Sequence, residues 1–398
     1  MYLAHDLGQL ASGTTMPPEP LRSDLRPLDK VDAIEWRWLS ERAVEPNAFL
    51  SPSHYLALHS HASRAKPAKA VTVRGRDGML AGMLPLVGAW AALFLPIPAL
   101  VIGQPYIPLG TPLIGGDDTV AIAGAMIDMA REAGVAMIAL PLVRSDGPVA
   151  KAFGEALAAR GMRATRRNLH QRAALSAKGD SENYLRGGLG AKKLKELRRQ
   201  RHRLEDQGTV EWRVSRTPAE LDDALERFLT LEASGWKGDT GTALGRNDGD
   251  AAYIRSACKA FGAEGRLEIC ELLLEEKPVA SGIVFRSADH AFFFKTAYDE
   301  DHMRMSPGVQ LTVELTRHLM ADPQVRLTDS VAIADHPMID HIWKDRIDIC
   351  DLYLPTRKGI VPRICMAAFD TRGLLKRAAK AALSILSSSR QVHGRTAR

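Results

Sequence analysis

Three side chains in the second half of the chain have the chemistry for proton transfer. Asp329 lies in a short stretch that is typical of a strand, His336 opens the segment after it, and Tyr298 ends an earlier aromatic run. A carboxylate or imidazole beside an amine can accept its proton, and a phenol can protonate a leaving group. We therefore predict Asp329 or His336 as a general base and Tyr298 as a general acid. The structural alternatives are a turn at Asp329, a helix cap at His336 and a packed strand tyrosine.

An anion-binding loop is predicted between the aromatic strand at 291–298 and a helix at 309–319. Ser306 is a favourable N-cap residue, Pro307 then falls at the first helical position, and Gly308 allows close approach to the backbone. The first amide N–H groups of a helix lack intrahelical partners and attract anions. The predicted pyrophosphate site comprises Arg304, Met305, Ser306, Pro307 and Gly308. The alternative is an ordinary connection between a strand and a helix.

Substrate contacts are predicted at two further places. Trp236 and Lys237 lie in a polar, glycine-rich loop at 235–249, which is long enough to be functional rather than a plain connection. Lys295 lies in the aromatic strand, where it would bind a phosphate or carboxylate or pair with an acidic side chain. Packing at the end of a helix is the alternative role of Trp236.

Composition limits the class of protein. The chain has 398 residues, of which 45% are hydrophobic and 25% charged, and its net charge is +6 with a pI near 9.1. This balance is globular, and the mild basicity suits CoA phosphates or anionic lipids without indicating nucleic acid. The four cysteines are scattered, which predicts reduced thiols, a cytoplasmic protein and no metal site. The first twenty residues lack the features of a secretory signal.

Alternating strand and helix patterns predict two consecutive α/β units that must position these residues. The expected boundaries are a flexible N-terminus at 1–25, a first domain at 26–176, a second at 177–356 and a basic C-terminal tail at 357–398. A strongly basic helix at 192–205 opens the second unit, and it either contacts phosphates or lipid or is simply solvated. In the tail, residues 373–386 predict an amphipathic helix that packs on the body or lies on a membrane.

The apolar run at 79–103 is long enough to span a bilayer. It contains three prolines, however, and proline disrupts a helix. We predict buried strands at 79–87, 92–95 and 100–102, with membrane contact as the alternative. The proline-rich stretch at 105–114 is expected to form a loop that lines a groove.

A series of short motifs in the second unit carries a family resemblance. The series comprises the basic helix, Trp236-Lys237-Gly238, Pro278-Val279-Ala280, Lys295-Thr296-Ala297-Tyr298-Asp299 and Ser306-Pro307-Gly308. It resembles the GNAT acyltransferase superfamily, in a tandem branch similar to FemAB-type aminoacyltransferases and to acetyltransferase-like proteins linked to cellulose biosynthesis. The resemblance covers roughly residues 170–355.

The resemblance implies an α/β (α+β) fold of two tandem GNAT-like domains, the first one degenerate. It implies a mixed sheet splayed at its centre, with acyl-CoA in the cleft and pyrophosphate on the loop at 304–308. The usual loop has two spaced glycines, whereas this sequence has only Gly308, which leaves acyl carrier protein and other donors open.

The implied activity is transfer of an acyl group from a thioester to an amine, without a metal. The amine would belong to a lipid or a sugar of the cell envelope, and N-acylation like that of a ceramide synthase is included. The chain lacks a Ser-His-Asp or Cys-His signature, which fits direct attack by the amine. The expected partners are acyl-CoA or acyl carrier protein, the amine acceptor and the surface of the inner membrane. The alternatives are a non-catalytic scaffold of polysaccharide biosynthesis and an aminoacyl-tRNA-dependent transferase, in which the helix at 192–203 would bind RNA.

Overall fold

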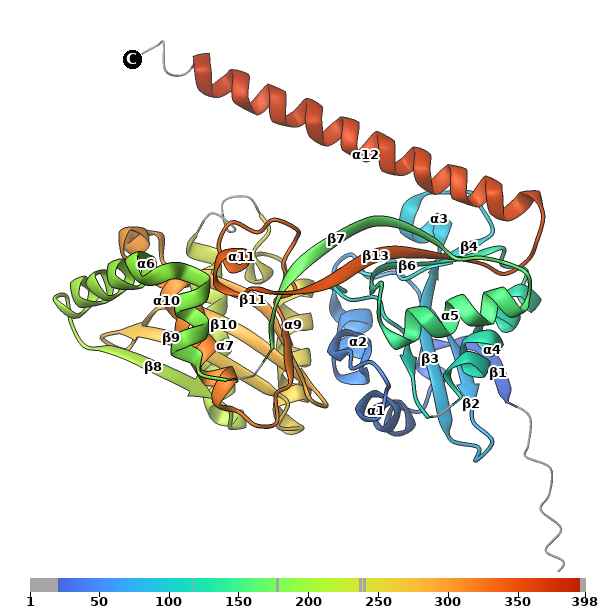
Figure 1. The fold of residues 1–398 in the computed structure, drawn as a ribbon, viewed down its shortest axis with the longest axis horizontal. Helices are drawn as coiled ribbons and strands as arrows, with labels where there is room; N and C mark the ends of the chain where they lie inside the picture. Colours follow the sequence, from blue (N-terminus) through green and yellow to red (C-terminus); the bar gives the residue numbers. More distant parts are fainter. Residues whose placement is uncertain (1–20, 117, 177–178, 236–237, 239–240, 394–398) are drawn as a thin grey trace, which may run out of the picture.

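The structure is a computed structural model that describes residues 21–116, 118–176, 179–235, 238 and 241–393, with side chains to residue 379 (Figure 1). Two halves lie side by side, and a long C-terminal helix runs above them. Among the described residues no helix is both long and apolar enough to cross a membrane.

The first half alternates strands and helices. Its elements are β1 (Arg22–Pro27), η1 (Leu28–Lys30), α1 (Ala33–Glu41), η2 (Ala48–Leu50), α2 (Pro52–His61), β2 (Lys69–Arg74), β3 (Leu80–Gly88), α3 (Ala89–Leu93), β4 (Ala99–Val101), β5 (Leu113–Ile114), α4 (Thr119–Glu132), β6 (Met137–Arg144), α5 (Pro148–Ala159) and β7 (Thr165–Ser176).

The second half repeats this alternation. Its elements are α6 (Ser181–Glu205), β8 (Val210–Ser215), α7 (Pro218–Ser234), η3 (Leu244–Arg246), α9 (Asp248–Ala263), β9 (Leu267–Leu274), β10 (Lys277–Ser287), β11 (His290–Tyr298), η4 (Glu300–Met305), α10 (Pro307–Ala321), β12 (Leu327–Asp329), α11 (Ile339–Ile342) and β13 (Asp345–Pro355), followed by α12 (Ile360–His393).

One mixed sheet runs through both halves of the described chain. Its strand order is β1-β2-β3-β4-β6-β13-β7-β12-β11-β10-β9-β8, and β5 pairs with β3. The long strands β7 and β13 pair with each other and join the two halves: β13 continues onto β6 of the first half and β7 onto β12 of the second (Figure 1). Each half is therefore completed by a strand from the other part of the sequence.

The two halves share one strand plan. In the first half β4 pairs with β3 antiparallel and with β6 parallel, and the parallel pairing comprises three residue pairs. In the second half β11 pairs with β10 antiparallel and with β12 parallel, again through three residue pairs. A helix, α4 or α10, connects the two parallel strands each time. The prediction of a mixed α/β fold built from two tandem units is confirmed.

The apolar core is continuous between the halves. The helices α1, α2, α4, α5, α7 and α9 contribute to one cluster of buried residues, whereas α6, α10 and α11 cover the other face of the second half. The ring of Phe49, from the first half, lies 5.3 Å from Phe292 and 5.6 Å from Phe294, measured between centroids. Burying such a phenylalanine contributes about 1.5–3 kcal/mol. This contact fixes the first half against the back of β11.

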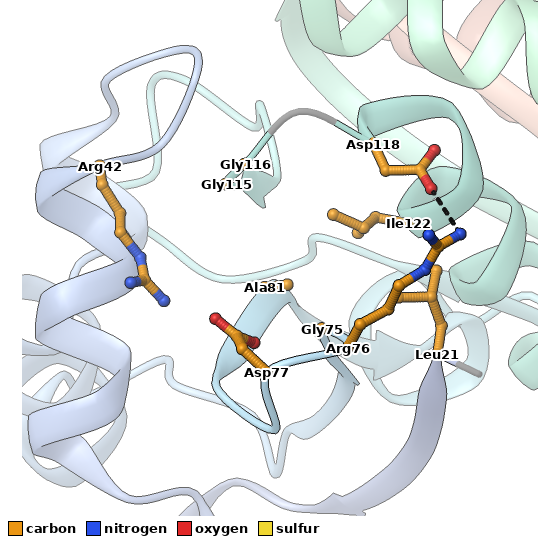
Figure 2. A pocket seen from close by; sticks show the side chains of 10 residues that line it. All are labelled: Leu21, Arg42, Gly75, Arg76, Asp77, Ala81, Gly115, Gly116, Asp118 and Ile122. Atoms are coloured by element: carbon orange, nitrogen blue, oxygen red, sulfur yellow. Dashed lines mark ion pairs between the residues drawn. The ribbon is translucent and has the colours of Figure 1, made fainter. Parts of the chain in front are cut away.

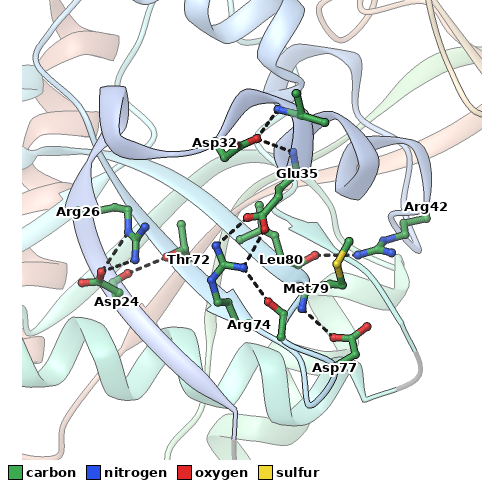
Figure 3. A network of polar contacts seen from close by, with 12 residues as sticks. Asp24, Arg26, Asp32, Glu35, Arg42, Thr72, Arg74, Asp77, Met79 and Leu80 are labelled. Atoms are coloured by element: carbon green, nitrogen blue, oxygen red, sulfur yellow. Dashed lines mark hydrogen bonds and ion pairs between the residues drawn. The ribbon is translucent and has the colours of Figure 1, made fainter.

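Local sequence signals account for most element ends. Helix α7 begins with a capping box between Thr217 and Glu220 and has a proline at its first position. Asp32 caps α1 by accepting hydrogen bonds from two backbone N–H groups (Figure 3). Glu35 of that helix binds both terminal nitrogens of Arg74 in β2, at 2.7 and 3.0 Å, and so attaches α1 to the end of β2.

Three local predictions are corrected by the structure. In place of the predicted strand at 92–95, residues 92–93 end helix α3 and residues 94–95 form no strand, because the Ala89–Leu93 segment is alanine-rich and favours a helix. The sequence pattern also predicts two short strands at 161–175, but the structure has the single long strand β7 there, kinked at Asn168, whose φ is 51°. Ser306 does occupy the N-cap position of α10, but in a left-handed conformation (φ 52°) and without a side-chain hydrogen bond to the helix.

Candidate active site

The candidate site is a cleft where β11 and β12 separate. Their parallel pairing ends at Phe292 and Asp329, and beyond this point the two strands diverge. The cleft has a volume of about 310 Å³. One wall is β11, and the other is the chain that follows β12. The lining residues are Phe293, Phe294, Lys295, Thr296, Ser330, Val331, Ala332, His336, Met338 and Ile339.

A β-bulge in β11 determines which side chains face which helix. Phe293 pairs with Val284 and Lys295 pairs with Ile283, so Phe294 is an extra residue without an opposite partner in the pairing. A bulge shifts the alternation of side chains by one position. Lys295 consequently reaches towards α7, while Tyr298 lies against Gly308 at the start of α10.

Lys295 forms an ion pair at the side of the cleft. Its Nζ lies 3.0 Å from Oε1 of Glu232 in α7, whose side chain is fully buried. Oε2 of Glu232 accepts a hydrogen bond of 2.8 Å from the N–H of Leu244. A buried carboxylate of this kind requires a cation and hydrogen bonds to offset its lost hydration. The pair therefore fixes the loop after α7 relative to β11.

Tyr106 brings the first half of the chain to the site. Its ring lies 6.0 Å from Nζ of Lys295 and is stacked on Tyr253 at 5.1 Å between centroids. Its hydroxyl donates a 2.7 Å hydrogen bond to Asp250. Burial, and then the Asp250 carboxylate, raise the pKa of Tyr106 to about 12, so it stays protonated at neutral pH. The prediction of a loop at 105–114 holds for 105–112, whereas 113–114 form β5; Tyr106 of this loop packs beside the cleft lysine.

The predicted anion loop is rigid and offers few amide groups. Gln310 donates a 2.7 Å hydrogen bond to the carbonyl of Met305, and Gln200 of α6 donates one of 3.2 Å to that of Arg304. The N–H groups of Val309 and Gln310 both donate to the Ser306 carbonyl, and Pro307 has none. In the described chain the Gly308 N–H has no acceptor. The sequence predicts several free backbone N–H groups at this helix start, whereas the described chain offers one, that of Gly308.

The basic helix α6 lies beside this loop. Arg304 is exposed and has no ion pair within the described residues. The basic helix α6 packs beside α10, and Leu194, Leu197, Arg198 and Arg201 face a hollow of about 90 Å³ between them. Helix α6 kinks at Gly190, where φ is 77°. An anion at the loop would be held by one amide, the helix dipole and these guanidinium groups.

Asp329 lies at the closed end of the cleft, where its carboxylate is already paired. The Nε of Arg172, from β7, lies 3.4 Å from Oδ1 of Asp329, and both side chains are buried. The same oxygen accepts a 2.8 Å hydrogen bond from the N–H of Val331, whose φ is 55°. Arg172 is held in turn by two hydrogen bonds to the Pro108 carbonyl. These contacts make Asp329 the residue that shapes the turn along one wall.

His336 is half-buried and lines the open part of the cleft. Its Nδ1 accepts the N–H groups of Met338 and Ile339, at 3.3 and 3.4 Å. A neutral imidazole that accepts at Nδ1 carries its hydrogen on Nε2. The ring is therefore both a cap for α11 and a hydrogen-bond donor at Nε2. Helix α11 is anchored behind it by Trp343, which donates a 2.9 Å hydrogen bond to Thr316 of α10.

The remaining predicted residues are distributed along β11 and beyond it. Tyr298 faces a small hollow of about 20 Å³ next to the cleft, and Thr296 lines both. Trp236 and Lys237 lie outside the described residues. Gly238, which follows them, is required there, because a Cβ at this position would collide with the carbonyl of Ala233. The structure therefore places Lys295 and His336 on the cleft, whereas Tyr298 lines the neighbouring hollow.

A larger hollow, of about 360 Å³, lies in the first half near the start of α4 (Figure 2). It is lined by two arginines and two aspartates, and Arg76 forms an ion pair of 3.6 Å with Asp118 across it. This hollow is not between the parallel strands. The cleft between β4 and β6 that corresponds to the site is reduced to about 220 Å³ and is lined by Phe369 and Arg372 of α12. Each half therefore has a cleft where two parallel strands separate, and the larger of the two is in the second half.

The described part of the chain shows neither a group of metal ligands nor a reactive cysteine. No three His, Cys, Asp or Glu side chains there are grouped as metal ligands. All four cysteines are buried free thiols. Burial raises the pKa of Cys258 and Cys270, which makes both poor nucleophiles.

Sequence reasoning missed the residues that complete the site. These residues lie far from Lys295 and Asp329 in sequence, and no local sequence pattern predicts them. They are Glu232, Tyr106, Asp250 and Arg172. The only signals were an acidic residue in the apolar last turn of α7 and a tyrosine between prolines.

Comparison with known proteins gives a consistent result. Residues 191–337 match the family model of the acetyltransferase (GNAT) domain. The fold resembles a conserved protein of unknown function from Bacteroides thetaiotaomicron VPI-5482, at 13% identity and a TM-score of 0.53 over 81% of this chain and 98% of that one. It also resembles the C-terminal domain of a putative lysylphosphatidylglycerol synthetase from Agrobacterium fabrum, at 12% identity and 0.53 over 85% and 95%. FemX gives 10% identity and 0.50 over 80% and 96%. No curated protein matches the sequence.

Proposed function

We propose that this chain, whose residues 191–337 match the acetyltransferase (GNAT) domain, is an N-acyltransferase. It would move an acyl group from an acyl-CoA or acyl carrier protein thioester to an amine of an envelope lipid or sugar. The observation that carries the proposal is the cleft of about 310 Å³ between the diverging parallel strands β11 and β12.

The donor would lie along the open edge of β11. The backbone beyond Phe292 is not paired with β12, so its N–H and C=O groups can bind the amides of a pantetheine arm, much as an added strand would. The phosphates would reach the start of α10, where the Gly308 N–H, the helix dipole and Arg304 meet. Because the loop has one glycine and one free amide, it suits a thioester donor in general rather than acetyl-CoA in particular.

The acceptor would approach from the side of Lys295 and Tyr106. This wall is built from both halves of the chain, which gives the first half a role in substrate binding even though we regard its own strand cleft as degenerate. The Lys295 ammonium would bind a phosphate or another anionic group of the acceptor near the reacting amine. An anionic amine-bearing lipid fits this arrangement, and N-acylation like that of a ceramide synthase is one member of the class. Lysylphosphatidylglycerol synthetase, the name of one structural neighbour, also denotes transfer to a lipid.

The chemistry proposed is direct transfer. The neutral amine nitrogen attacks the thioester carbon, a backbone N–H of β11 stabilises the oxyanion, and the C–S bond breaks as the C–N bond forms. The amine loses its proton to water in the open cleft. The thiolate leaves with a hydrogen bond from the Nε2–H of His336, whose tautomer makes it a donor rather than a base, and then takes up a proton from water. Tyr298 remains an alternative donor, and Asp329 is assigned a positioning role because it is paired with Arg172.

The proposal is tested by amine-dependent release of thiol from a panel of acyl-CoA thioesters, with mass spectrometry of the products. We expect equal amounts of free thiol and amide for at least one chain length. An absence of release from every thioester would favour a binding scaffold. Transfer that depends on aminoacyl-tRNA and is abolished by ribonuclease would favour the FemAB-like alternative, in which the basic α6 binds RNA.

A further inference from the structure

The long helix α12 has two apolar sides, and only one of them packs on the protein. Cys365 and Phe369 are buried against α3, β4 and β6. Ile360, Ile364, Leu374 and Leu375 are large apolar residues on other parts of the helix surface, and all are more than half exposed. Their spacing of four, ten and one residues places them on one stripe of an α-helix. This stripe points away from the core.

A second exposed apolar group lies beside the helix. Trp90 of α3 is 62% exposed and Phe94, which follows α3 in a left-handed conformation (φ 57°), is 71% exposed. Their rings contact each other edge to face, with centroids 6.1 Å apart. Leu93, between them, lines the same hollow as Phe369, Arg372 and Lys376 of α12. The aromatic pair and the apolar stripe thus belong to adjoining elements, as Figure 1 also shows.

The charges around these residues are nearly all positive. From Arg357 to the end of the sequence there are ten lysines and arginines and one acidic residue, Asp370. Asp370 is itself paired with Arg167 of β7, at 3.1 Å. Lys376 and Arg377 directly follow the exposed leucines and are exposed themselves. Two copies of such a helix would repel each other, whereas an anionic surface would attract it.

We propose that α3 and α12 form a docking surface for an anionic lipid bilayer. Trp90, Phe94, Leu374 and Leu375 would enter the boundary between head groups and acyl chains, where tryptophan is favoured. Arg377, beside the stripe, and Lys376, at the hollow next to Phe369, would bind lipid phosphates from the two sides of the helix. The helix does not span the membrane but lies on it. Binding to a bilayer would bring the enzyme to its acceptor if that acceptor is a lipid. The inference rests on the proposed function only for this biological reason, because the surface itself is argued from exposed apolar and basic residues.

Vesicle flotation tests the inference without any substrate, so its outcome is separate from that of the transfer assay. The full chain is mixed with vesicles of phosphatidylcholine alone or of phosphatidylcholine with phosphatidylglycerol. We expect binding to the anionic vesicles, reduced by high salt. Leu374→Gln/Leu375→Gln and Lys376→Glu/Arg377→Glu should each lower the bound fraction by more than about tenfold. The matched control is Ile34→Gln on α1, another exposed apolar residue, which should bind as the wild type does.

Two results would overturn the proposal. The first is binding that is absent, or that is unchanged in both α12 variants. The second is a dimer of the wild-type chain in solution that dissociates in Leu374→Gln/Leu375→Gln, because the stripe would then be an interface between two copies. Circular dichroism of each variant verifies that α12 and the body remain folded, and variants with exposed side chains on this helix should show an unchanged spectrum.

Discussion

The ammonium group of Lys295 lies 3.0 Å from Oε1 of Glu232, and this pair joins the central strand β11 to helix α7 beside the cleft. The carboxylate is buried, so the pair has a structural role whatever its role in catalysis. The two roles can be separated by experiment.

Lys295→Met should lower both stability and activity. Removing one partner of a buried ion pair costs about 3–5 kcal/mol of unfolding free energy. In the double variant Lys295→Met/Glu232→Gln the uncompensated charge is gone, so urea unfolding should show most of that stability restored. Amide formation should stay low in the double variant, because the acceptor has lost its cation. Recovery of activity together with stability would show that Lys295 serves the fold alone.

Gly308→Leu should weaken binding of the thioester donor while the protein stays folded. A Cβ at this position would lie 3.4 Å from the ring of Tyr298, an ordinary contact, but a longer side chain would displace Tyr298 or Met338. Gly308→Ala is the matched control, since it fits and favours the helix. Calorimetric titration with acyl-CoA should show at least about a tenfold loss for leucine and little loss for alanine. Equal affinities for both variants would remove the loop from the donor site.

His336→Ala should reduce turnover by about 10²–10³-fold, the usual loss when one hydrogen bond to developing negative charge is removed. His336→Gln retains an N–H donor and should retain part of the rate. Asp329→Asn, in contrast, should act on stability, because Arg172 would be left buried without its anion. Near-normal turnover of His336→Ala would discard its role in transfer, and unchanged urea unfolding of Asp329→Asn would discard the positioning role of Asp329.

Stability should fall as the pH drops from about 6.5 towards 3, in part through His54. Burial lowers the pKa of His54 to about 3, although the Phe49 carbonyl opposes this. Between these values the unfolded chain binds a proton that the folded chain does not, so acid favours unfolding. His54 of α2 accepts a 2.7 Å hydrogen bond from Tyr253 of α9, so the effect acts on the contact between the halves. His54→Gln retains an acceptor without titrating, and urea unfolding at pH 7 and pH 5 should show a smaller loss for it. Parallel losses in both proteins would contradict this assignment.

The sequence predicts the elements of the site better than their partners. The strand, loop and helix around Ser306 follow from local signals, namely an aromatic run, a proline at the first helical position and helical apolar spacing. The bulge at Phe294 has no such signal, yet it decides that Lys295 faces Glu232 rather than α10. The pairing of Asp329 with Arg172 depends on β7, which enters the second half from far away in the sequence. Pairings of this kind depend on topology and cannot be read from a local pattern.

At Ala89–Leu93 the local pattern itself is ambiguous, and the sequence prediction chooses the wrong kind of element. Short apolar runs suit a strand or a helix equally well, and here local propensity favours α3. A buried strand at 92–95 would bury Phe94. In the structure both Trp90 and Phe94 are exposed.

The most direct test of the donor site compares two tryptophan substitutions by calorimetric titration with acyl-CoA. Ala332→Trp fills the cleft between β11 and β12, whereas Ala81→Trp fills the larger hollow of the first half (Figure 2). We predict that Ala332→Trp abolishes donor binding and that Ala81→Trp binds as the wild type does. Retained affinity in Ala332→Trp, with loss in Ala81→Trp, would contradict the account and assign the donor to the other half of the molecule.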